Sequence, residues 1–313
     1  MRRSAAKLVL VLLLGVGLGC AQVLQHIEGA AQGAVSAVVS DPGAVKEKVE
    51  EVTEKVFEFT RDLTPEQEHY LGRSVTARIL GQYGNRYRDM SAIEKARLEG
   101  ITAYVSQVGA LVAAAAIEQA DRPRVPYSGW HFVVVDDPEI AAFAAPAGFV
   151  VVTTGAVESA QTEDELACLL AHEVAHVVHG HGLTAVKKAR FAGAIGGLMT
   201  KATSKLTDTE VGELAAAFND TVGDITESLF TKGYEKGTEF EADLLGAKAA
   251  AAAGYDPYAM VAFLRTAHRS QKVKSQGHPE FSDRITRLQK RYSSPAVASN
   301  ERAARFTSAK NLL

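Results

Sequence analysis

The stretch ELACLLAHEVAHVVHGHG, residues 165–182, places four histidines and two glutamates in a run that otherwise resembles a buried helix. On a helix, His172 and His176 are four residues apart and lie on one face, one turn from each other. Two imidazoles at this spacing can bind one metal ion. Glu173 is rotated by about 100° from His172 and can reach a water molecule beside that ion. The HExxH pattern therefore predicts two zinc ligands and a general base.

The alternative is that these side chains are hydrogen-bonded core residues. An HExxH match occurs by chance in on the order of one chain in a hundred of this size, so the five residues alone do not decide. Their neighbours are mostly Leu, Ala and Val. Burying two histidines and a glutamate among such residues costs several kcal/mol unless something compensates them, and a metal ion does so. The surroundings therefore favour a metal site.

A catalytic zinc site needs a third protein ligand and one open position. The metzincin pattern HExxHxxGxxH would place Gly at position 179 and His at position 182. The chain has His179 and Gly182 instead, which excludes that class. We do not expect His179 or His181 to bind the metal.

A second acidic cluster, GTEFEADLLG, begins a predicted helix at 237–252. Within it, Glu239 and Asp243 are one turn apart on the same face. One of them can therefore bind the metal while the other accepts a hydrogen bond from a ligand imidazole. The alternative is an acidic helix N-terminus that the helix dipole favours.

These motifs occur in a specific order. The segment AAFAAPAGFVVVTTGAVESAQTEDELACLLAHEVAHVVHGH, followed by EFEAD and HPEFSDRI, resembles the HtpX-like and CAAX-prenyl-protease-type zinc metallopeptidases of peptidase family M48. Soluble periplasmic lipoprotein members are the most similar in layout, and the similarity covers 64–292. The resemblance implies a mainly helical α+β fold of the zincin type. Its parts are an active-site helix, a small β-sheet with a substrate-binding edge strand, and a downstream helix that supplies the third ligand.

The resemblance also implies residue roles. It makes Glu239 the third ligand of one Zn²⁺ per chain, Asp243 the partner of a ligand, and Glu241 a bystander. The family's late His-Pro motif begins at His278, and Arg284 follows six residues later. By resemblance, His278 and Arg284 approach the catalytic centre and stabilise the oxyanion or position the peptide. In some relatives the histidine can also cap the metal.

The resemblance further predicts how substrate binds. In the turn before the sheet strand, Ala141 and Ala147 replace the Asn and the first Gly that are usual in the family. The strand after this turn is expected to be the edge to which a substrate backbone adds as an extra strand. Its residues are Phe149, Val150, Val151, Val152 and Thr153.

The predicted function is a zinc endopeptidase that acts on unfolded or misassembled cell-envelope proteins, with polypeptides as partners. The alternative is a peptide-binding chaperone or assembly factor whose proteolysis is gated or weak. The complete set of His172, Glu173, His176 and Glu239 favours the enzyme, because a protein that only binds peptide does not need the base.

The first twenty residues are typical of a secretory signal peptide, with a cationic start and an apolar run from Leu8 to Leu18. That run is shorter than the roughly 20 residues of a bilayer span, which argues against a retained anchor. GLGC resembles a lipoprotein box in which Cys20 is lipidated, although Gly17 occupies the usual Leu position. Ordinary signal cleavage is the alternative. An alanine after the cysteine, here Ala21, is typical of lipoproteins that are sorted to the outer membrane. We therefore expect a periplasmic lipoprotein anchored to the outer membrane.

Charge and cysteine content argue against several other functions and structural features. The 34 basic and 37 acidic residues leave a net charge of -3, which gives no sign of a nucleic-acid partner. Cys168 is the only cysteine besides Cys20, so the mature chain has no intramolecular disulfide. We expect Cys168 to be a small buried side chain rather than a catalytic thiol.

Periodicity and turn signals divide the chain. We predict four regions: a signal peptide at 1–20, a tether and amphipathic helix at 21–63, the metallopeptidase domain at 64–292 and a polar, fraying tail at 293–313. Within the domain we predict helices at 65–83, 91–116, 162–188, 237–252 and 256–270, with a final loop to 292. We also predict a hairpin or short sheet containing Phe132–Val135 and Phe149–Thr153. The Gly-, Ala- and Thr-rich stretch 190–235 has no pattern that indicates chemistry.

Overall fold

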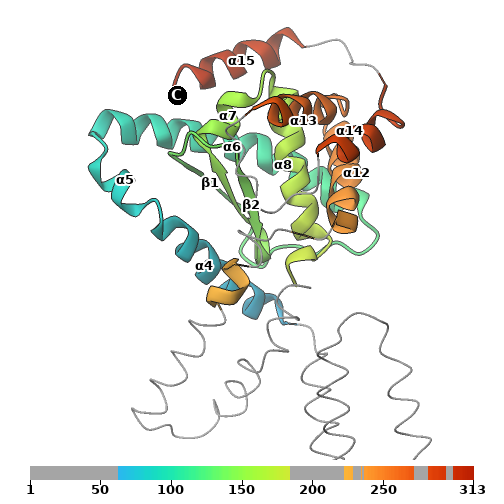
Figure 1. The fold of residues 1–313 in the computed structure, drawn as a ribbon. Helices are drawn as coiled ribbons and strands as arrows, with labels where there is room; N and C mark the ends of the chain where they lie inside the picture. Colours follow the sequence, from blue (N-terminus) through green and yellow to red (C-terminus); the bar gives the residue numbers. More distant parts are fainter. Residues whose placement is uncertain (1–62, 184–221, 228–233, 235, 271–280, 294–298) are drawn as a thin grey trace, which may run out of the picture. The chain divides into compact units, whose positions relative to one another are not determined.

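The computed structural model describes residues 63–183, 222–227, 234, 236–270, 281–293 and 299–313 (Figure 1). All of them belong to the larger of two compact units, which comprises 63–189 and 206–313. The predicted signal peptide, Cys20 and nearly all of the predicted tether and amphipathic helix lie outside the described residues, so these expectations stay predictions.

The predicted fold class is confirmed, because the described residues form mainly helices around one small mixed sheet. The elements follow the chain in this order: α4 (Pro65–Gly81), α5 (Gly84–Asp89), α6 (Ala92–Gln119), β1 (His131–Val135), β2 (Ala142–Ala145), the 3-10 turn η1 (Pro146–Gly148), β3 (Phe149–Thr153), α7 (Thr154–Ser159), α8 (Glu163–Val178), α12 (Lys236–Ala252), α13 (Ala259–Arg269), α14 (Phe281–Gln289) and α15 (Asn300–Lys310).

Capping residues explain where the first helices begin. Thr64 and Gln67 form a capping box at the start of α4, and Ser91 and Glu94 form another at the start of α6. The helix predicted at about 65–83 is confirmed as α4, which ends at Gly81 before the short α5.

The active-site helix α8 is shorter than predicted. Its N-cap is Thr162, whose hydroxyl accepts a hydrogen bond from the backbone N–H of Glu165. The helix ends at Val178, and Gly180 then adopts a left-handed conformation with φ 70°. That conformation suits glycine and stops the helix well before the predicted end at residue 188.

The sheet has the strand order β1-β3-β2, with β1 parallel and β2 antiparallel to β3. The predicted short sheet is confirmed, and the runs Phe132–Val135 and Phe149–Thr153 are parallel neighbours in it rather than the two strands of a hairpin. The order corrects one prediction, because β3 is the central strand and not the predicted substrate-binding edge. Phe149 to Thr153 pair with β1 on one side, and Phe149 to Val152 pair with β2 on the other.

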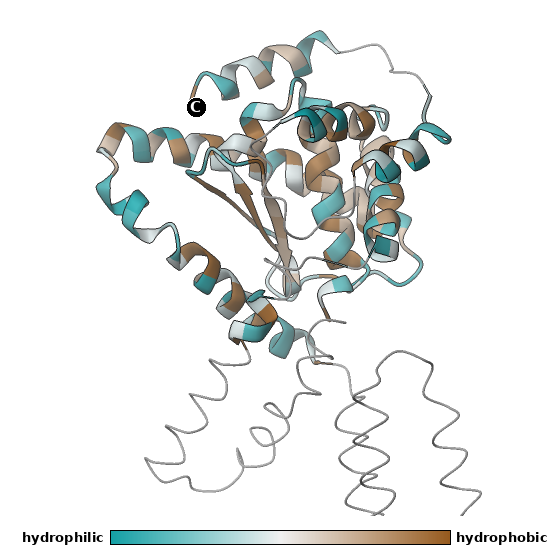
Figure 2. Ribbon diagram, in the orientation of Figure 1, coloured by the Kyte–Doolittle hydropathy of each residue, from teal (hydrophilic) through white to brown (hydrophobic). Residues whose placement is uncertain are grey.

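Helices cover both faces of the sheet. Val150 and Val152 of β3 belong to the core formed with α6 and α8, whereas Val151 belongs to a second core with Val75 and Ile79 of α4. This alternation follows from the two-residue period of a strand. Figure 2 shows the strands as hydrophobic between these layers, and Figure 1 shows α8 and α12 next to each other.

Helix α6 is the one helix among the described residues that is long and apolar enough to cross a bilayer. It packs on β1, α8 and α12, and Ile101, Val105 and Val112 are fully buried in that contact. Since the core of a globular domain produces the same pattern, we interpret α6 as a core helix.

The prediction of a fraying C-terminal tail is wrong. Helix α15 buries Phe306 and Ala309, and Arg305 forms a bidentate ion pair with Glu163 at the start of α8. Glu163 is only 1% exposed and also accepts a hydrogen bond from the Tyr104 hydroxyl at 2.7 Å. A buried carboxylate needs such partners, so α15 is held against the active-site helix.

Candidate metal centre

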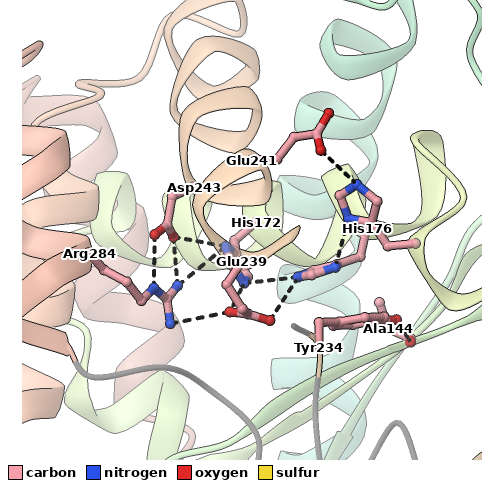
Figure 3. A network of polar contacts seen from close by, with 9 residues as sticks. Ala144, His172, His176, Tyr234, Glu239, Glu241, Asp243 and Arg284 are labelled. Atoms are coloured by element: carbon pink, nitrogen blue, oxygen red, sulfur yellow. Dashed lines mark hydrogen bonds and ion pairs between the residues drawn. The ribbon is translucent and has the colours of Figure 1, made fainter. Parts of the chain in front are cut away.

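Two helices supply the predicted ligands. His172 and His176 extend from one face of α8, and Glu239 extends from the first turn of α12 toward them (Figure 3). All three residues are at most 2% exposed. These are residues that the sequence predicted, and the structure brings them together.

A glycine allows the two helices to approach each other. If Gly246 of α12 carried a Cβ atom, that atom would lie 2.8 Å from the backbone nitrogen of His172. Any larger residue would therefore separate the helices. This close contact brings the first turn of α12 within reach of the imidazoles.

The ligand atoms have the spacing of a zinc site. The His172 Nε2 and His176 Nε2 atoms are 3.2 Å apart. Glu239 Oε2 lies 3.4 Å from His172 Nε2, and Glu239 Oε1 lies 3.5 Å from His176 Nε2. In a tetrahedral zinc site with bonds of about 2.0–2.1 Å, neighbouring ligand atoms are about 3.3 Å apart. The two imidazole nitrogens thus have the spacing of a tetrahedral zinc site, and each of them faces one oxygen of the Glu239 carboxylate.

Asp243 and Arg284 form a layer behind the ligands. Asp243 Oδ1 lies 3.1 Å from His172 Nδ1, the nitrogen that faces away from the other ligands. Arg284 donates to both oxygens of Asp243, at 2.8 and 2.6 Å, and its Nη1 lies 3.5 Å from Glu239 Oε2. This carboxylate–histidine arrangement orients a metal ligand and fixes its tautomer.

The structure confirms that Arg284 approaches the centre. Its described contacts are with protein carboxylates and with His172, and its side chain is 4% exposed. These contacts support a role in which Arg284 holds Asp243 and Glu239 in position around His172. Its predicted role toward the oxyanion or the peptide stays a prediction.

Replacing Arg284 with Met is expected to lower the free energy of unfolding by about 3–5 kcal/mol, because it removes the guanidinium that pairs with the buried Asp243 carboxylate and lies 3.5 Å from Glu239. The measurement is chemical unfolding with a zinc chelator present, so that metal binding does not contribute. Lys290→Met removes an exposed cation just after the same helix and is the control. Equal stability of the two variants would contradict the assigned role of Arg284.

Electrostatics in the metal-free centre favour a charged His172. Burial and Arg284 lower the pKa of His172, but hydrogen bonds to Asp243 and Glu239 outweigh them and raise it to about 9. Burial raises the pKa of Asp243, yet Arg284 and His172 together bring it down to about 2. At neutral pH the metal-free His172 is therefore an imidazolium with a proton on each ring nitrogen, and metal binding must displace the proton on Nε2.

Zinc binding at pH 7 is expected to release about one proton, because a ligand imidazole must be neutral. Calorimetric titration in two buffers with different ionisation enthalpies measures the number of protons released.

The raised pKa of His172 also predicts how the stability of the metal-free protein depends on pH. Since the folded-state pKa of His172 is raised to about 9, protonation stabilises the fold fully below its ordinary value of 6.5. That contribution is lost as pH rises through about 9. Zinc binding without proton release would contradict this account.

Two residues that contact His176 were not predicted to be part of the metal centre. The Tyr234 ring stacks on the His176 ring with centroids 4.0 Å apart and an interplanar angle of 14°. His181, which we did not expect to bind the metal, has its Nδ1 3.0 Å from His176 Nδ1. The stretch 190–235 had no periodic pattern that could have identified Tyr234.

The other predicted residues are placed as follows. Glu173 is 3% exposed in α8, one residue after His172. His278 lies outside the described residues, and its role stays a prediction. Cys168 is buried, as expected, and burial raises the pKa of its thiol. Glu241, expected to be a bystander, lies with Oε2 3.8 Å from His181 Nε2.

Sequence comparison with known proteins identifies relatives that are metallopeptidases. The sequence pattern of Peptidase family M48 matches residues 103–292. The chain is 28% identical over 171 residues to the beta-barrel assembly-enhancing protease of Yersinia pestis, covering 53% of this chain and 32% of that protein. It is 29% identical over 163 residues to the mitochondrial metalloendopeptidase OMA1 of Bos taurus, covering 52% of this chain and 30% of that protein. The chain thus aligns with about a third of the length of these relatives.

Proposed function

The chain belongs to peptidase family M48, and on that premise we propose that it is a zinc-dependent endopeptidase that hydrolyses peptide bonds. The observation that carries the proposal is the buried cluster of His172, His176 and Glu239, whose ligand atoms all lie within 4.8 Å of one another. Their two imidazoles and one carboxylate are the ligand set of a catalytic zinc site.

The proposed mechanism assigns one task to each group. His172, His176 and Glu239 hold the metal, which when bound supplies Lewis-acid chemistry and lowers the pKa of water toward about 7. Glu173 accepts a proton from the attacking water as its oxygen adds to the peptide carbonyl carbon. Glu173 then gives this proton to the amine nitrogen as the C–N bond breaks. Asp243 keeps the Nδ1 proton of His172 in place, so that Nε2 faces the metal.

The proposed binding edge for substrate is β2. Thr153 donates its backbone N–H to the Ala141 carbonyl at 3.0 Å. Because bonded and non-bonded pairs alternate in an antiparallel ladder, the backbone groups of Ala142 and Ala144 point away from β3. The Tyr234 hydroxyl lies 3.4 Å from the Ala144 carbonyl oxygen, and the Tyr234 ring stacks beside His176. An extended peptide paired to this edge would therefore run past the metal centre.

A scan of N-methylated peptide substrates tests this edge. Each backbone hydrogen bond contributes about 0.5–1.5 kcal/mol, so methylation at every second residue is expected to lower kcat/KM by up to about tenfold. Methylation at the residues between them is expected to have little effect, since their N–H groups point away from β2. Losses without this alternation would contradict the binding mode.

We extend the proposal to a substrate class, unfolded or misassembled cell-envelope proteins. Its support is indirect. Two kinds of relative are named beta-barrel assembly-enhancing protease and mitochondrial metalloendopeptidase, and the N-terminal sequence predicts export with a lipid anchor at Cys20. Binding through backbone groups tolerates varied side chains, which suits an enzyme that acts on many unfolded chains.

The second candidate is a peptide-binding chaperone or assembly factor with gated or weak proteolysis. One observation favours it, namely the burial of the centre, with His172 at 2% and Glu173 at 3% exposure. Incubating the zinc-loaded protein with casein and sequencing the new termini distinguishes the candidates. Internal cleavage supports the endopeptidase, whereas suppressed aggregation without new termini supports the chaperone.

A further inference from the structure

The environment of His176 differs from that of His172. The Nδ1 atom of His172 lies next to the Asp243 carboxylate, and Arg284 donates a hydrogen bond to each oxygen of that carboxylate. On the other side of His176 lies another imidazole, His181, with the two Nδ1 atoms 3.0 Å apart. His181 is 9% exposed and begins the helical residues 181–183, directly after the turn of His179 and Gly180.

The contacts determine which nitrogen carries each proton. His176 Nε2 faces the other ligands, at 3.2 Å from His172 Nε2 and 3.5 Å from Glu239 Oε1, so its lone pair must be there when a metal is bound. Its proton is then on Nδ1 and can be donated to His181 Nδ1. His181 must accept at that atom, so it carries its own proton on Nε2, which lies 3.8 Å from Glu241 Oε2.

The same contacts exclude His181 as a metal ligand in this arrangement. Its Nδ1 lies 3.0 Å from His176 Nδ1, whereas His176 Nε2 is the nitrogen that lies next to His172 and Glu239. The cluster of possible ligand atoms among the described residues comprises only His172, His176 and Glu239. His181 therefore acts through His176.

We propose that His181 is a positioning residue that fixes the tautomer and the orientation of the zinc ligand His176. The inference rests on the proposed zinc site and extends it to a residue outside the ligand set. The hydrogen bond to His181 fixes the imidazole at one edge, while Tyr234 lies against its face with centroids 4.0 Å apart. Two ligands of one site are thus oriented by different chemistry, a carboxylate for His172 and a neutral imidazole for His176.

Zinc affinity, measured by competition with a chromophoric chelator, tests the proposal. Loss of a partner that orients a metal ligand weakens binding by about 10–100-fold, and we expect this for His181→Ala. His181→Asn places an amide oxygen near the position of Nδ1, so it is expected to restore affinity to within about fivefold. His179→Ala is the matched control, because it removes a neighbouring imidazole whose ring centroid lies 6.0 Å from that of His181 and leaves the contact between His181 and His176 in place.

Wild-type affinity in His181→Ala would overturn the proposal, and so would equal losses in the Ala and Asn variants. Nitrogen-15 NMR of histidine in the unchanged, zinc-loaded protein gives a second test that needs no variant. We expect His176 to be protonated on Nδ1 and His181 on Nε2, and a proton on His181 Nδ1 would overturn the proposal. Absence of zinc binding by the unchanged protein would instead contradict the proposed function.

Discussion

Zinc-loaded protein carrying Glu173→Gln is expected to cleave an unfolded substrate about 10²–10⁴-fold more slowly than the unchanged protein. Glutamine keeps the shape and the polarity of the side chain but cannot accept a proton. Glu173 is 3% exposed between the two ligand histidines of α8. Zinc affinity is expected to be retained, because Glu173 is not one of the three predicted ligands.

The measurement compares initial rates of casein cleavage at equal zinc content. Glu158→Gln is the control, since this carboxylate is exposed on α7. Equal rates for the Glu173 variant and the unchanged protein would remove the proposed base from the mechanism.

Glu239→Ala is expected to weaken zinc binding by more than about 100-fold, the upper range for losing a partner that only orients a ligand. Its carboxylate is fully buried and supplies one of the three ligand atoms. Activity is expected to disappear at zinc concentrations that saturate the unchanged protein. Competition with a chelator measures the affinity directly.

Glu241→Ala is the matched control, two residues further along the same helix. Its side chain is 58% exposed and lies 3.8 Å from His181 Nε2, so its contribution is expected to be at most a few-fold. Equal losses in the two variants would mean that the acidic helix start acts through its total charge. The identity of the third ligand would then be wrong.

The ligand set could be predicted because helical periodicity directly relates sequence spacing to geometry. His172 and His176 share a face of α8, and Glu239 and Asp243 share a face of α12. Spacing alone left open which acidic residue binds, and the resemblance pointed to Glu239. The close approach of the helices depends on Gly246, whose role appears only when α12 lies against His172.

The strand order could not be predicted from local patterns. The resemblance assigned the substrate-binding edge to Phe149–Thr153, the strand that follows the turn, but this strand lies in the centre of the sheet. The edge strand β2 consists of three alanines and a phenylalanine, and alanine has a low strand propensity. Tertiary pairing with β3 determines its conformation.

Two distant contacts were also hidden from the sequence. Helix α15 is polar, and its attachment depends on Arg305 reaching a buried glutamate 142 positions earlier in the chain. Tyr234 likewise joins the centre from a stretch with no periodic pattern. Single residues that contact each other over such separations leave no local signal.

The central claim is that one zinc ion, held by His172, His176 and Glu239, is required for peptide-bond hydrolysis by this chain. The most direct measurement is a zinc titration of metal-stripped protein while casein cleavage is followed. The account predicts no cleavage before zinc is added and a linear rise in rate that stops at one zinc per chain. Cleavage that persists in the stripped protein, or zinc that binds at this stoichiometry without producing any cleavage, would contradict it.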